Sequence, residues 1–314
     1  MSKPLPLLLW HGLGDRFDNE GLQSVGDLAE QAWPGTQVQI ISLGTDGDED
    51  RKATFFGNVS EQIDHVCAGL FSNTSLADPS TGKIRADALG FSQGGQFLRG
   101  LLERCDNLSI RSLITFGSQH NGINEFSKCG QWDFLCKGAL GLVKGNAWGH
   151  WVQGNVVPAQ YYRRADPETG LGTAEYLEAS HFLADINNEK ILKNKVYSNR
   201  LASLESFVMY VFNNDTTVIP KESGWFAEVN ETSGEVTPLQ ERALYKEDWL
   251  GLKKLDKKGG LVFRSHPGGH MRLEEDRLLE AFKEFYGPER SGSAVSTSRI
   301  QKVLNALRQI VIST

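Results

Sequence analysis

The sequence lacks any long hydrophobic run. No stretch of about 18 consecutive apolar residues occurs, so no helix long enough to span a bilayer is predicted. Basic residues are not in excess either, because 39 Asp and Glu outnumber 33 Lys and Arg. The resulting net charge of −6 offers no basic face, and we expect no nucleic-acid partner.

Motifs for metals and phosphates are also missing. There is no H-E-x-x-H pair, no paired C-x-x-C knuckle, no P-loop and no G-x-G-x-x-G that opens the first helix. We therefore expect neither a metal nor an organic cofactor. What is present is ordinary for a globular protein, with 39% hydrophobic and 23% charged residues in 314, enough for one large domain.

The first apolar segment is Pro4–Trp10, and a Gly-rich turn follows it at once. It is too short for a signal peptide and is interpreted as a buried strand. On this evidence the protein either stays in the cytosol or lacks its leader in this chain.

Strand-like and helix-like patterns alternate along the chain, which is typical of a mostly parallel sheet with helices on both faces. The apolar runs that predict strands are Leu5–Trp10, Gln37–Ser42, Ala86–Phe91, Ile110–Phe116, Ser206–Phe212 and Gly260–Phe263. The clearest helical patterns cover 96–104 and 272–285. The predicted fold class is therefore α/β.

The alternation stops between residues 117 and 204, a stretch rich in Gly, Trp and Tyr. Long excursions of this kind are usually functional, so we expect a cap inserted into a single domain that spans 1–290. Residues 291–314 predict a Ser-rich linker and an amphipathic helix. This helix either docks on the core or contacts a membrane or partner.

Ser92 stands in the motif G-x-S-x-G, between a predicted strand and a predicted helix. This strand–turn–helix setting is the one that a nucleophile elbow requires. The flanking glycines allow a tight turn, and the helix N-terminus favours developing negative charge at the serine. Ser92 is therefore predicted to be a nucleophile.

A serine nucleophile needs a base, and the base needs an acid; in this fold they follow the serine in the order acid, then histidine. Asp215 follows a predicted strand and is the candidate acid, although a loop Asp can also serve only the turn. His266 and His270 compete for the base. We favour His270, since it directly precedes the last helix and follows two flexible glycines.

Two backbone N–H groups are needed to stabilise an oxyanion. Gln93 follows the nucleophile and is one expected donor. Leu13, in the Gly-rich turn after the first strand, is the other, unless this segment is a plain turn.

The four cysteines leave two interpretations open, buried thiols or disulfide pairs. Glycosylation sequons favour pairing and a secretory-pathway protein; they lie at Asn58, Asn73, Asn107, Asn214 and Asn230.

Together these segments resemble the lysosomal palmitoyl-protein thioesterases. The stretches that carry the resemblance, from about residue 5 to 286, are Trp10–Asp15, Gly90–Arg99, Gly117–Gly122, FLADIN around Ile186, Phe207–Asp215, Pro238–Leu255 and Gly268–Leu273. The chain departs from the family in lacking a leader, in having Arg16-Phe17 where some relatives have adjacent cysteines, and in its tail beyond Gly287.

The resemblance implies an α/β-hydrolase with Ser92, Asp215 and His270 as the triad, disulfides Cys67–Cys105 and Cys129–Cys136, and a lysosomal or vacuolar location. It also implies that the cap supplies a groove for a fatty chain. Candidate lining residues are Trp148, Trp151, Tyr161, Tyr162, Phe182 and Leu183, although these side chains could equally form the core of the cap.

The implied reaction is removal of palmitate from S-acylated cysteines of proteins or peptides through an acyl-enzyme. Palmitoyl-CoA is a second expected substrate. The alternatives are an acyl-CoA thioesterase or ester lipase on the same scaffold, a cytosolic acyl-protein thioesterase, and an inactive relative that binds lipid or protein. The intact triad candidates argue against the inactive relative.

Overall fold

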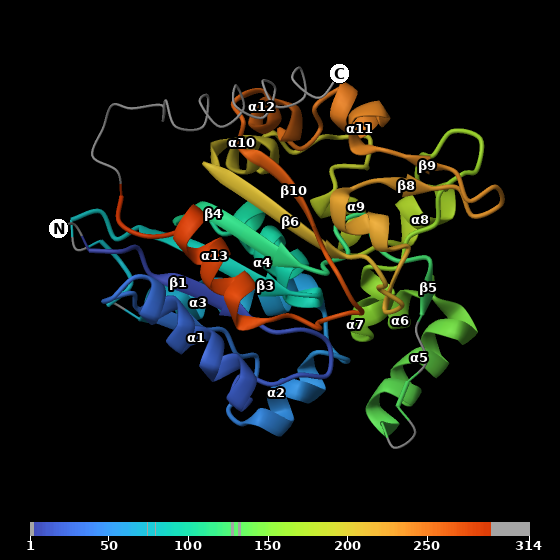
Figure 1. The fold of residues 1–314 in the computed structure, drawn as a ribbon. Helices are drawn as coiled ribbons and strands as arrows, with labels where there is room; N and C mark the ends of the chain where they lie inside the picture. The colour runs from blue at the N-terminus through green and yellow to red at the C-terminus, as the bar shows by residue number, and fades with distance from the viewer. Residues whose placement is uncertain (1–2, 74, 79, 127–128, 131–132, 290–314) are drawn as a thin grey trace.

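The computed structural model describes residues 3–73, 75–78, 80–126, 129–130 and 133–289. Its centre is a six-stranded sheet in the order β10-β6-β4-β3-β1-β2, and every neighbouring pair in it is parallel (Figure 1). The strands are β1 (Leu7–Trp10), β2 (Val38–Ile40), β3 (Ile84–Phe91), β4 (Leu108–Phe116), β6 (Ser206–Phe212) and β10 (Leu261–His266).

Each of the six predicted strands is confirmed, and so is the α/β class. The largest difference in bounds is at β10, which runs on beyond the apolar run to His266. β10 is an edge strand that pairs only with β6, so Arg264 and Ser265 can extend it with exposed side chains.

The helices cover both faces of the sheet. Helices α1 (Glu20–Ala32) and α13 (Glu275–Phe285) pack together on one face. On the other lie α3 (Val59–Ser72), α4 (Gln93–Arg104), α10 (Lys195–Ser203) and α12 (Leu252–Lys257). The remaining short elements are α2 (Gly47–Ala53), β7 (Val218–Ile219), η1 (Lys221–Trp225), β8 (Glu228–Val229), β9 (Val236–Thr237), η2 (Leu239–Glu241) and α11 (Ala243–Lys246).

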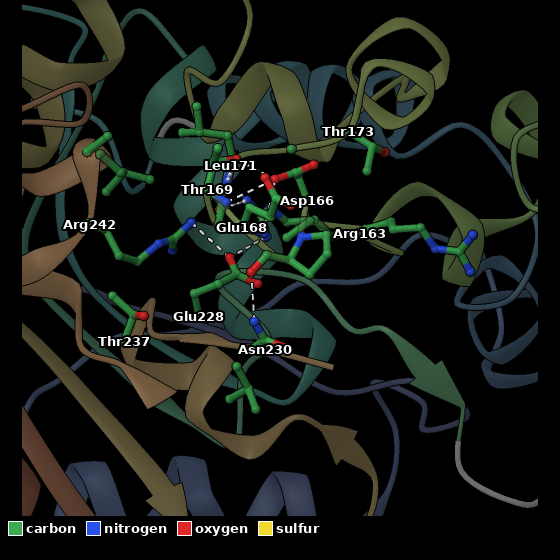
Figure 2. Close-up of a pocket in the computed structure, with 18 of the residues that line it drawn as sticks. Arg163, Asp166, Glu168, Thr169, Leu171, Thr173, Glu228, Asn230, Thr237 and Arg242 are labelled. Carbon is green, nitrogen blue, oxygen red and sulfur yellow. Dashed lines mark hydrogen bonds and ion pairs between the residues drawn. The ribbon is translucent and has the colours of Figure 1, made fainter. Parts of the chain in front are cut away.

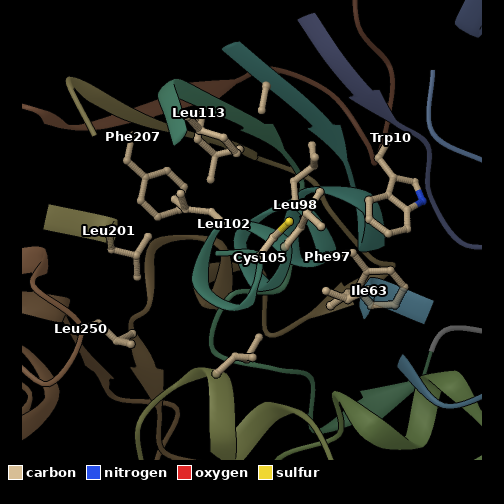
Figure 3. Close-up of a cluster of buried hydrophobic side chains, with 14 of the residues drawn as sticks. Trp10, Ile63, Phe97, Leu98, Leu102, Cys105, Leu113, Leu201, Phe207 and Leu250 are labelled. Atoms are coloured by element: carbon tan, nitrogen blue, oxygen red, sulfur yellow. The ribbon is translucent and has the colours of Figure 1, made fainter. Parts of the chain in front are cut away.

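Strand β1 shows how the sequence builds two cores. Because side chains alternate along a strand, Leu7 and Leu9 join the core under α1 and α13, while Leu8 and Trp10 join the larger core around α4. In the larger core, shown in Figure 3, Trp10 meets Phe97 of α4 edge to face with ring centroids 5.5 Å apart.

Between β4 and β6 the chain forms small elements, as the broken pattern from residue 117 suggests. They are β5 (Glu125–Phe126), α5 (Phe134–Asn146), α6 (His150–Asn155), α7 (Val157–Gln160), α8 (Ala174–Ala179), α9 (Leu183–Ile186) and α10. Helix α10 packs on α4 and α12 and so belongs to the layer on the sheet, whereas α5 projects from the body in Figure 1.

A buried cation fastens this region to α4. Arg99 has no exposed surface, and its guanidinium donates to the carbonyls of Ile186 at 3.0 Å and His120 at 3.2 Å and to Oδ1 of Asn187 at 2.7 Å. It also pairs with Glu103 one turn along α4 at 3.0 Å, where burial raises the pKa of Glu103 to about 8. Three stretches named in the resemblance therefore meet at one side chain.

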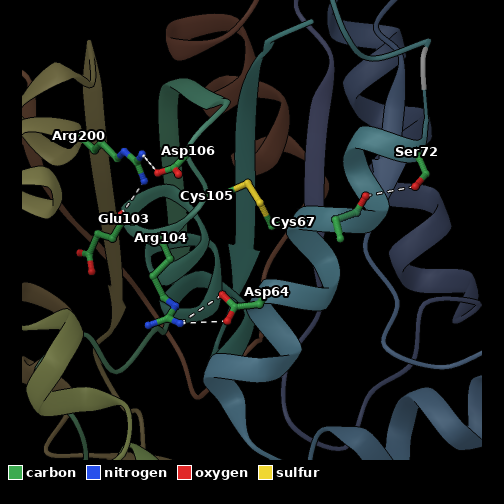
Figure 4. The surroundings of a disulfide bond; sticks show 9 residues. Asp64, Cys67, Ser72, Glu103, Arg104, Cys105, Asp106 and Arg200 are labelled. Carbon is green, nitrogen blue, oxygen red and sulfur yellow. Dashed lines mark hydrogen bonds and ion pairs between the residues drawn. A yellow bond between two sulfur atoms is a disulfide. The ribbon is translucent and has the colours of Figure 1, made fainter.

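Two disulfides are present, and both are the pairs that the resemblance implies. Cys67 of α3 is bonded to Cys105 at the end of α4, beside an ion pair between Asp64 and Arg104 (Figure 4). Cys129 is bonded to Cys136 in α5.

None of the helices in the described part of the chain is long and apolar enough to cross a membrane. The linker and amphipathic helix expected at 291–314 lie outside the described residues, so that division of the chain stays a prediction.

Replacing Cys67 and Cys105 together by serine should lower the free energy of unfolding by about 3–4 kcal/mol, because this bridge joins residues 38 apart in sequence. The Cys129–Cys136 bridge joins residues only 7 apart, and its double replacement should cost about 1–2 kcal/mol less. Urea unfolding followed by circular dichroism measures both losses. Equal losses would contradict loop length as the cause.

Candidate active site

Ser92 lies at the junction of β3 and α4 in a backbone conformation that side chains rarely adopt, with φ 50° and ψ −123°. The flanking glycines are required by close packing. A Cβ at Gly90 would lie 2.2 Å from Cα of Gly95, and a Cβ at Gly94 would lie 2.2 Å from the carbonyl oxygen of His11. The turn places the serine hydroxyl at the N-terminus of α4, where the helix dipole favours negative charge.

A histidine and an acid from two later loops meet this serine. Nε2 of His270 lies 3.1 Å from Oγ of Ser92, and Nδ1 of the same ring lies 2.7 Å from Oδ2 of Asp215. Both residues follow the carboxyl ends of parallel strands, β10 and β6. This arrangement can take a proton from the serine hydroxyl and hold the resulting imidazolium.

The carboxylate of Asp215 is fixed by the backbone as well. Its side chain is only 1% exposed, and Oδ1 accepts from the N–H groups of Thr217 at 2.8 Å and Val218 at 3.0 Å. With Oδ1 held in this way, Oδ2 is directed at His270 and favours the tautomer that carries its proton on Nδ1.

The competing candidate base, His266, lies elsewhere. It ends β10, is buried, and has Nε2 3.0 Å from Glu274 without the alignment of a hydrogen bond. Its ring packs edge to face against Phe212. The geometry therefore favours His270 as the partner of Ser92.

The two expected oxyanion donors lie on either side of the serine. Gln93 is the first residue of α4, where N–H groups have no partner within the helix. The loop of Leu13 touches the serine, since a Cβ at Gly12 would lie 3.1 Å from Cβ of Ser92. Within the described residues neither N–H donates a hydrogen bond, so both are free to bind an oxyanion.

A buried ion pair supports this loop. The side chains of His11 and Asp50 are fully buried, with Nε2 of the histidine 2.7 Å from the carboxylate, while Nδ1 lies 3.1 Å from the carbonyl oxygen of Gly12. Because both ring nitrogens face acceptors, the ring fits an imidazolium. Burial alone would lower the pKa of His11, but the hydrogen bond and charge of Asp50 raise it above 6.5.

A cavity of about 640 Å³ opens beside Ser92 and His270. Its polar lining includes Asp15, Asn19 and Gln119. Its apolar lining comes from the first loop, α1, the segment after α2, the ends of β3 and β7, the region from Ile123 to Tyr161, and the chain after His270. These residues are Leu13, Leu22, Val25, Phe55, Phe91, Ile123, Phe126, Leu140, Tyr161, Val218, Met271, Leu273 and Leu278. A largely apolar cavity beside Ser92 suits an acyl chain.

Of the groove residues expected from the sequence, only Tyr161 lines this cavity. Phe182 and Leu183 are fully buried in the core, where Phe182 packs edge to face on Phe97 of α4. Trp148 and Tyr162 pack on each other with ring centroids 5.3 Å apart, and Trp151 is 59% exposed. Aromatic content in a cap thus did not identify the groove.

The residues that sequence reasoning missed come mostly from the core domain. Leu22 and Val25 lie on the apolar face of α1, and their pattern does not distinguish a cavity wall from packing. Met271 directly follows His270, and Val218 lies three residues after Asp215. This closeness in sequence to the triad candidates was the one signal that they line the cavity.

A second cavity, also of about 640 Å³, lies among charged residues (Figure 2). Glu228 bridges Arg163 at 2.5 Å and Arg242 at 3.2 Å, and burial lowers the pKa of Arg242 to about 10. The described lining of this cavity holds no serine, cysteine or histidine. In the described chain no group of three His, Cys, Asp or Glu could hold a metal.

The sequon asparagines differ in their surroundings. Asn107 and Asn214 are exposed, and Asn58 caps α3. The amide nitrogens of Asn73 and Asn230 donate to Gln39 and Pro167.

The parallel sheet, the strained serine and the cavity beside it define an α/β-hydrolase, a class that cleaves ester and thioester bonds. The sequence model described as palmitoyl protein thioesterase matches residues 6–270, nearly the whole described chain. The chain therefore belongs to the palmitoyl protein thioesterase family, and it is a thioester or ester hydrolase.

Curated relatives agree with this membership. Palmitoyl-protein thioesterase 1 of Caenorhabditis elegans is 35% identical over 91% of this chain and 93% of its own. A palmitoyl-protein thioesterase–dolichyl pyrophosphate phosphatase fusion of Schizosaccharomyces pombe is 37% identical over 90% of this chain and 44% of its own. A lysosomal thioesterase of Xenopus laevis is 30% identical over 84% and 85%. Among solved structures, an esterase of Butyrivibrio proteoclasticus matches with TM-score 0.46 and 12% identity over 89% of this chain and 87% of its own.

The buried pair of His11 and Asp50 should make stability depend on pH. Because the folded-state pKa of His11 is raised above 6.5, the stabilisation is complete below pH 6.5 and is lost as the pH rises through the folded-state pKa. His11→Asn should lack this part of the slope, whereas His65→Asn, at an exposed position on α3, should keep it. Urea unfolding across pH measures the slope, and an unchanged slope in His11→Asn would refute the assignment.

Proposed function

We propose that this protein removes long-chain acyl groups, palmitoyl above all, from cysteine side chains of S-acylated proteins. The observation that carries the proposal is the contact of Ser92 with His270 at the mouth of a largely apolar cavity. Family membership supports the thioester as the bond that is cleaved.

In the first half of the reaction, Oγ of Ser92 attacks the thioester carbonyl carbon while Nε2 of His270 takes the hydroxyl proton. The tetrahedral oxyanion accepts hydrogen bonds from the N–H groups of Leu13 and Gln93. The carbon–sulfur bond then breaks, the cysteine sulfur receives the proton from His270, and the acyl group stays on Ser92 as an ester.

In the second half, His270 takes a proton from water, which attacks the acyl ester. The carbon–oxygen bond to Ser92 breaks, the proton returns to Oγ, and the fatty acid leaves. Asp215 keeps the imidazole oriented in both halves and stabilises its charged form.

Binding energy is expected to come from the lipid more than from the peptide. Each buried methylene contributes about 0.8 kcal/mol, so a palmitoyl chain supplies roughly 10 kcal/mol before the costs of ordering. The lining of the cavity is apolar along α1, α5 and the segment after His270, and the polar members Asp15, Asn19 and Gln119 suit a headgroup or peptide backbone. We therefore expect the enzyme to select its substrates by their acyl chain more than by their peptide sequence.

The same geometry would also serve an acyl-CoA thioesterase or an ester lipase, because the triad acts alike on carbon–sulfur and carbon–oxygen bonds. Thiolates leave more readily than alkoxides, which favours thioesters over oxygen esters, whereas discrimination between a peptide thioester and acyl-CoA must come from binding. An inactive lipid-binding relative is disfavoured, since serine, histidine and acid stand at hydrogen-bond distances.

We place the protein in the lysosome, vacuole or secretory pathway. All four cysteines are paired, and disulfides persist in oxidising compartments. The exposed sequons at Asn107 and Asn214 and the lysosomal thioesterase among the relatives support the same location. A cytosolic enzyme would instead have free thiols and no glycans, which thiol titration and a glycosidase gel shift would detect.

Ser92→Ala should lower kcat for a palmitoyl-cysteine peptide by about 10⁴-fold or more, because the acyl-enzyme can no longer form. The substrates are the palmitoyl peptide, palmitoyl-CoA and the matching palmitoyl oxygen ester, each tested on wild type and variant. A preference for the peptide thioester supports the proposal. Preference for CoA or for the oxygen ester would favour the corresponding alternative, and no turnover would favour the inactive relative.

Leu140→Trp should shorten the acyl chain that the cavity accepts, because Leu140 is buried in α5 and lines the cavity. We expect kcat/KM to fall about tenfold or more for the palmitoyl peptide and to change little for a butyryl peptide. The butyryl activity reports that the variant is folded.

Leu192→Trp is the matched control, since Leu192 is 90% exposed and does not line this cavity. An equal loss for both chain lengths in Leu140→Trp would argue against the cavity as the acyl site.

A further inference from the structure

Helix α5 carries apolar residues on two opposite faces. On its inner face Ala139 and Val143 are buried in a small cluster with Phe55. On its outer face Phe134 is 72% exposed and Leu142 is 39% exposed. Trp151 on the neighbouring helix α6 is 59% exposed. Large exposed apolar side chains on two helices in contact are characteristic of an interaction surface.

The segment of sequence that carries these side chains has charge of one sign. No Asp or Glu occurs between Asp133 and Asp166, although the whole chain has a net charge of −6. The outer face of α5 includes Lys137 and Lys144, both exposed. Asp133 itself pairs with Arg51 at 2.9 Å and caps α5, so its charge is already compensated.

Helix α5 also borders the proposed acyl site. Leu140 and Cys136 of α5 line the cavity beside Ser92, and Leu13 of the oxyanion loop packs against the same cluster as the inner face of α5. In Figure 1 α5 projects outward from the body, so a flat surface could reach its outer face.

We propose that Phe134, Lys137, Leu142, Lys144 and Trp151 form a docking face for an anionic phospholipid bilayer. The aromatic and aliphatic side chains enter the interfacial region, while the lysines contact lipid phosphates. Docking would bring the mouth of the cavity to the bilayer that holds the acyl chain of the substrate. This role of the docking face rests on the proposed function.

The chemistry of the face selects this partner over a second copy of the chain. A symmetric dimer through α5 would set Lys137 and Lys144 against the same two lysines of the second copy, which is unfavourable for like charges. Anionic headgroups instead present negative charge on one plane, and the hydrocarbon region receives the exposed rings.

Vesicle flotation tests the proposal without using catalysis. The full chain should float with vesicles of equal parts phosphatidylglycerol and phosphatidylcholine and only weakly with phosphatidylcholine alone. Phe134→Ser with Trp151→Ser should lower the partition coefficient about tenfold. Lys137→Gln with Lys144→Gln should lower it roughly thirtyfold, and added salt should have the same effect.

Ile191→Ser with Leu192→Ser is the matched control, because these side chains are 97% and 90% exposed and are also flanked by lysines. It should bind as the wild type does. The proposal is overturned if the control loses as much binding as the α5 variants, if phosphatidylcholine alone binds equally well, or if the α5 variants bind normally. If light scattering shows that the wild type is a dimer and that Phe134→Ser is a monomer, the face serves self-association instead.

Activity separates this proposal from the function. With a water-soluble butyryl thioester, Phe134→Ser with Trp151→Ser should retain wild-type kcat/KM, and with a palmitoyl peptide in anionic vesicles it should lose about tenfold. Flotation without any thioesterase activity would overturn the function and leave the docking face standing.

Discussion

The close approach of α4 to the ends of β3 and β1 is the constraint on which the site depends. A Cβ on Gly94 would lie within 2.2 Å of the carbonyl oxygen of His11, so the helix can begin only where glycine stands. The same approach forces Ser92 to φ 50° and brings the loop of Gly12 against its side chain. One packing contact thus positions both the proposed nucleophile and the proposed oxyanion donors.

The rest of the molecule holds that contact in place. Arg99 ties α4 to the segments at His120 and Ile186, and the buried pair of His11 and Asp50 fixes the start of the first loop. Removing either partner of such a pair would leave a buried charge uncompensated. Helix α5 is attached more lightly, through one small apolar cluster and a disulfide, and it carries the exposed apolar face.

Much of the fold could be predicted because its signals are local. Six apolar runs predicted six strands, and G-x-S-x-G between a strand and a helix predicted the turn at Ser92. Chain order limited the expected base to His266 or His270, and the two glycines before His270 favoured it. The groove was different: Phe182 was a candidate lining residue and lies in the core, whereas Leu22 and Leu278 line the cavity and were not predicted to do so.

The sequence by itself determined the sheet, the strained serine and the order of the three polar residues, because each depends on neighbours in the chain or on strand direction. Only the tertiary structure decided which apolar side chains line the cavity and which pack in the core. Apolar residues recur along a helix with the same period whether they line a cavity or pack in a core. The difference lies in whether another element packs against that face, as the two faces of α5 illustrate.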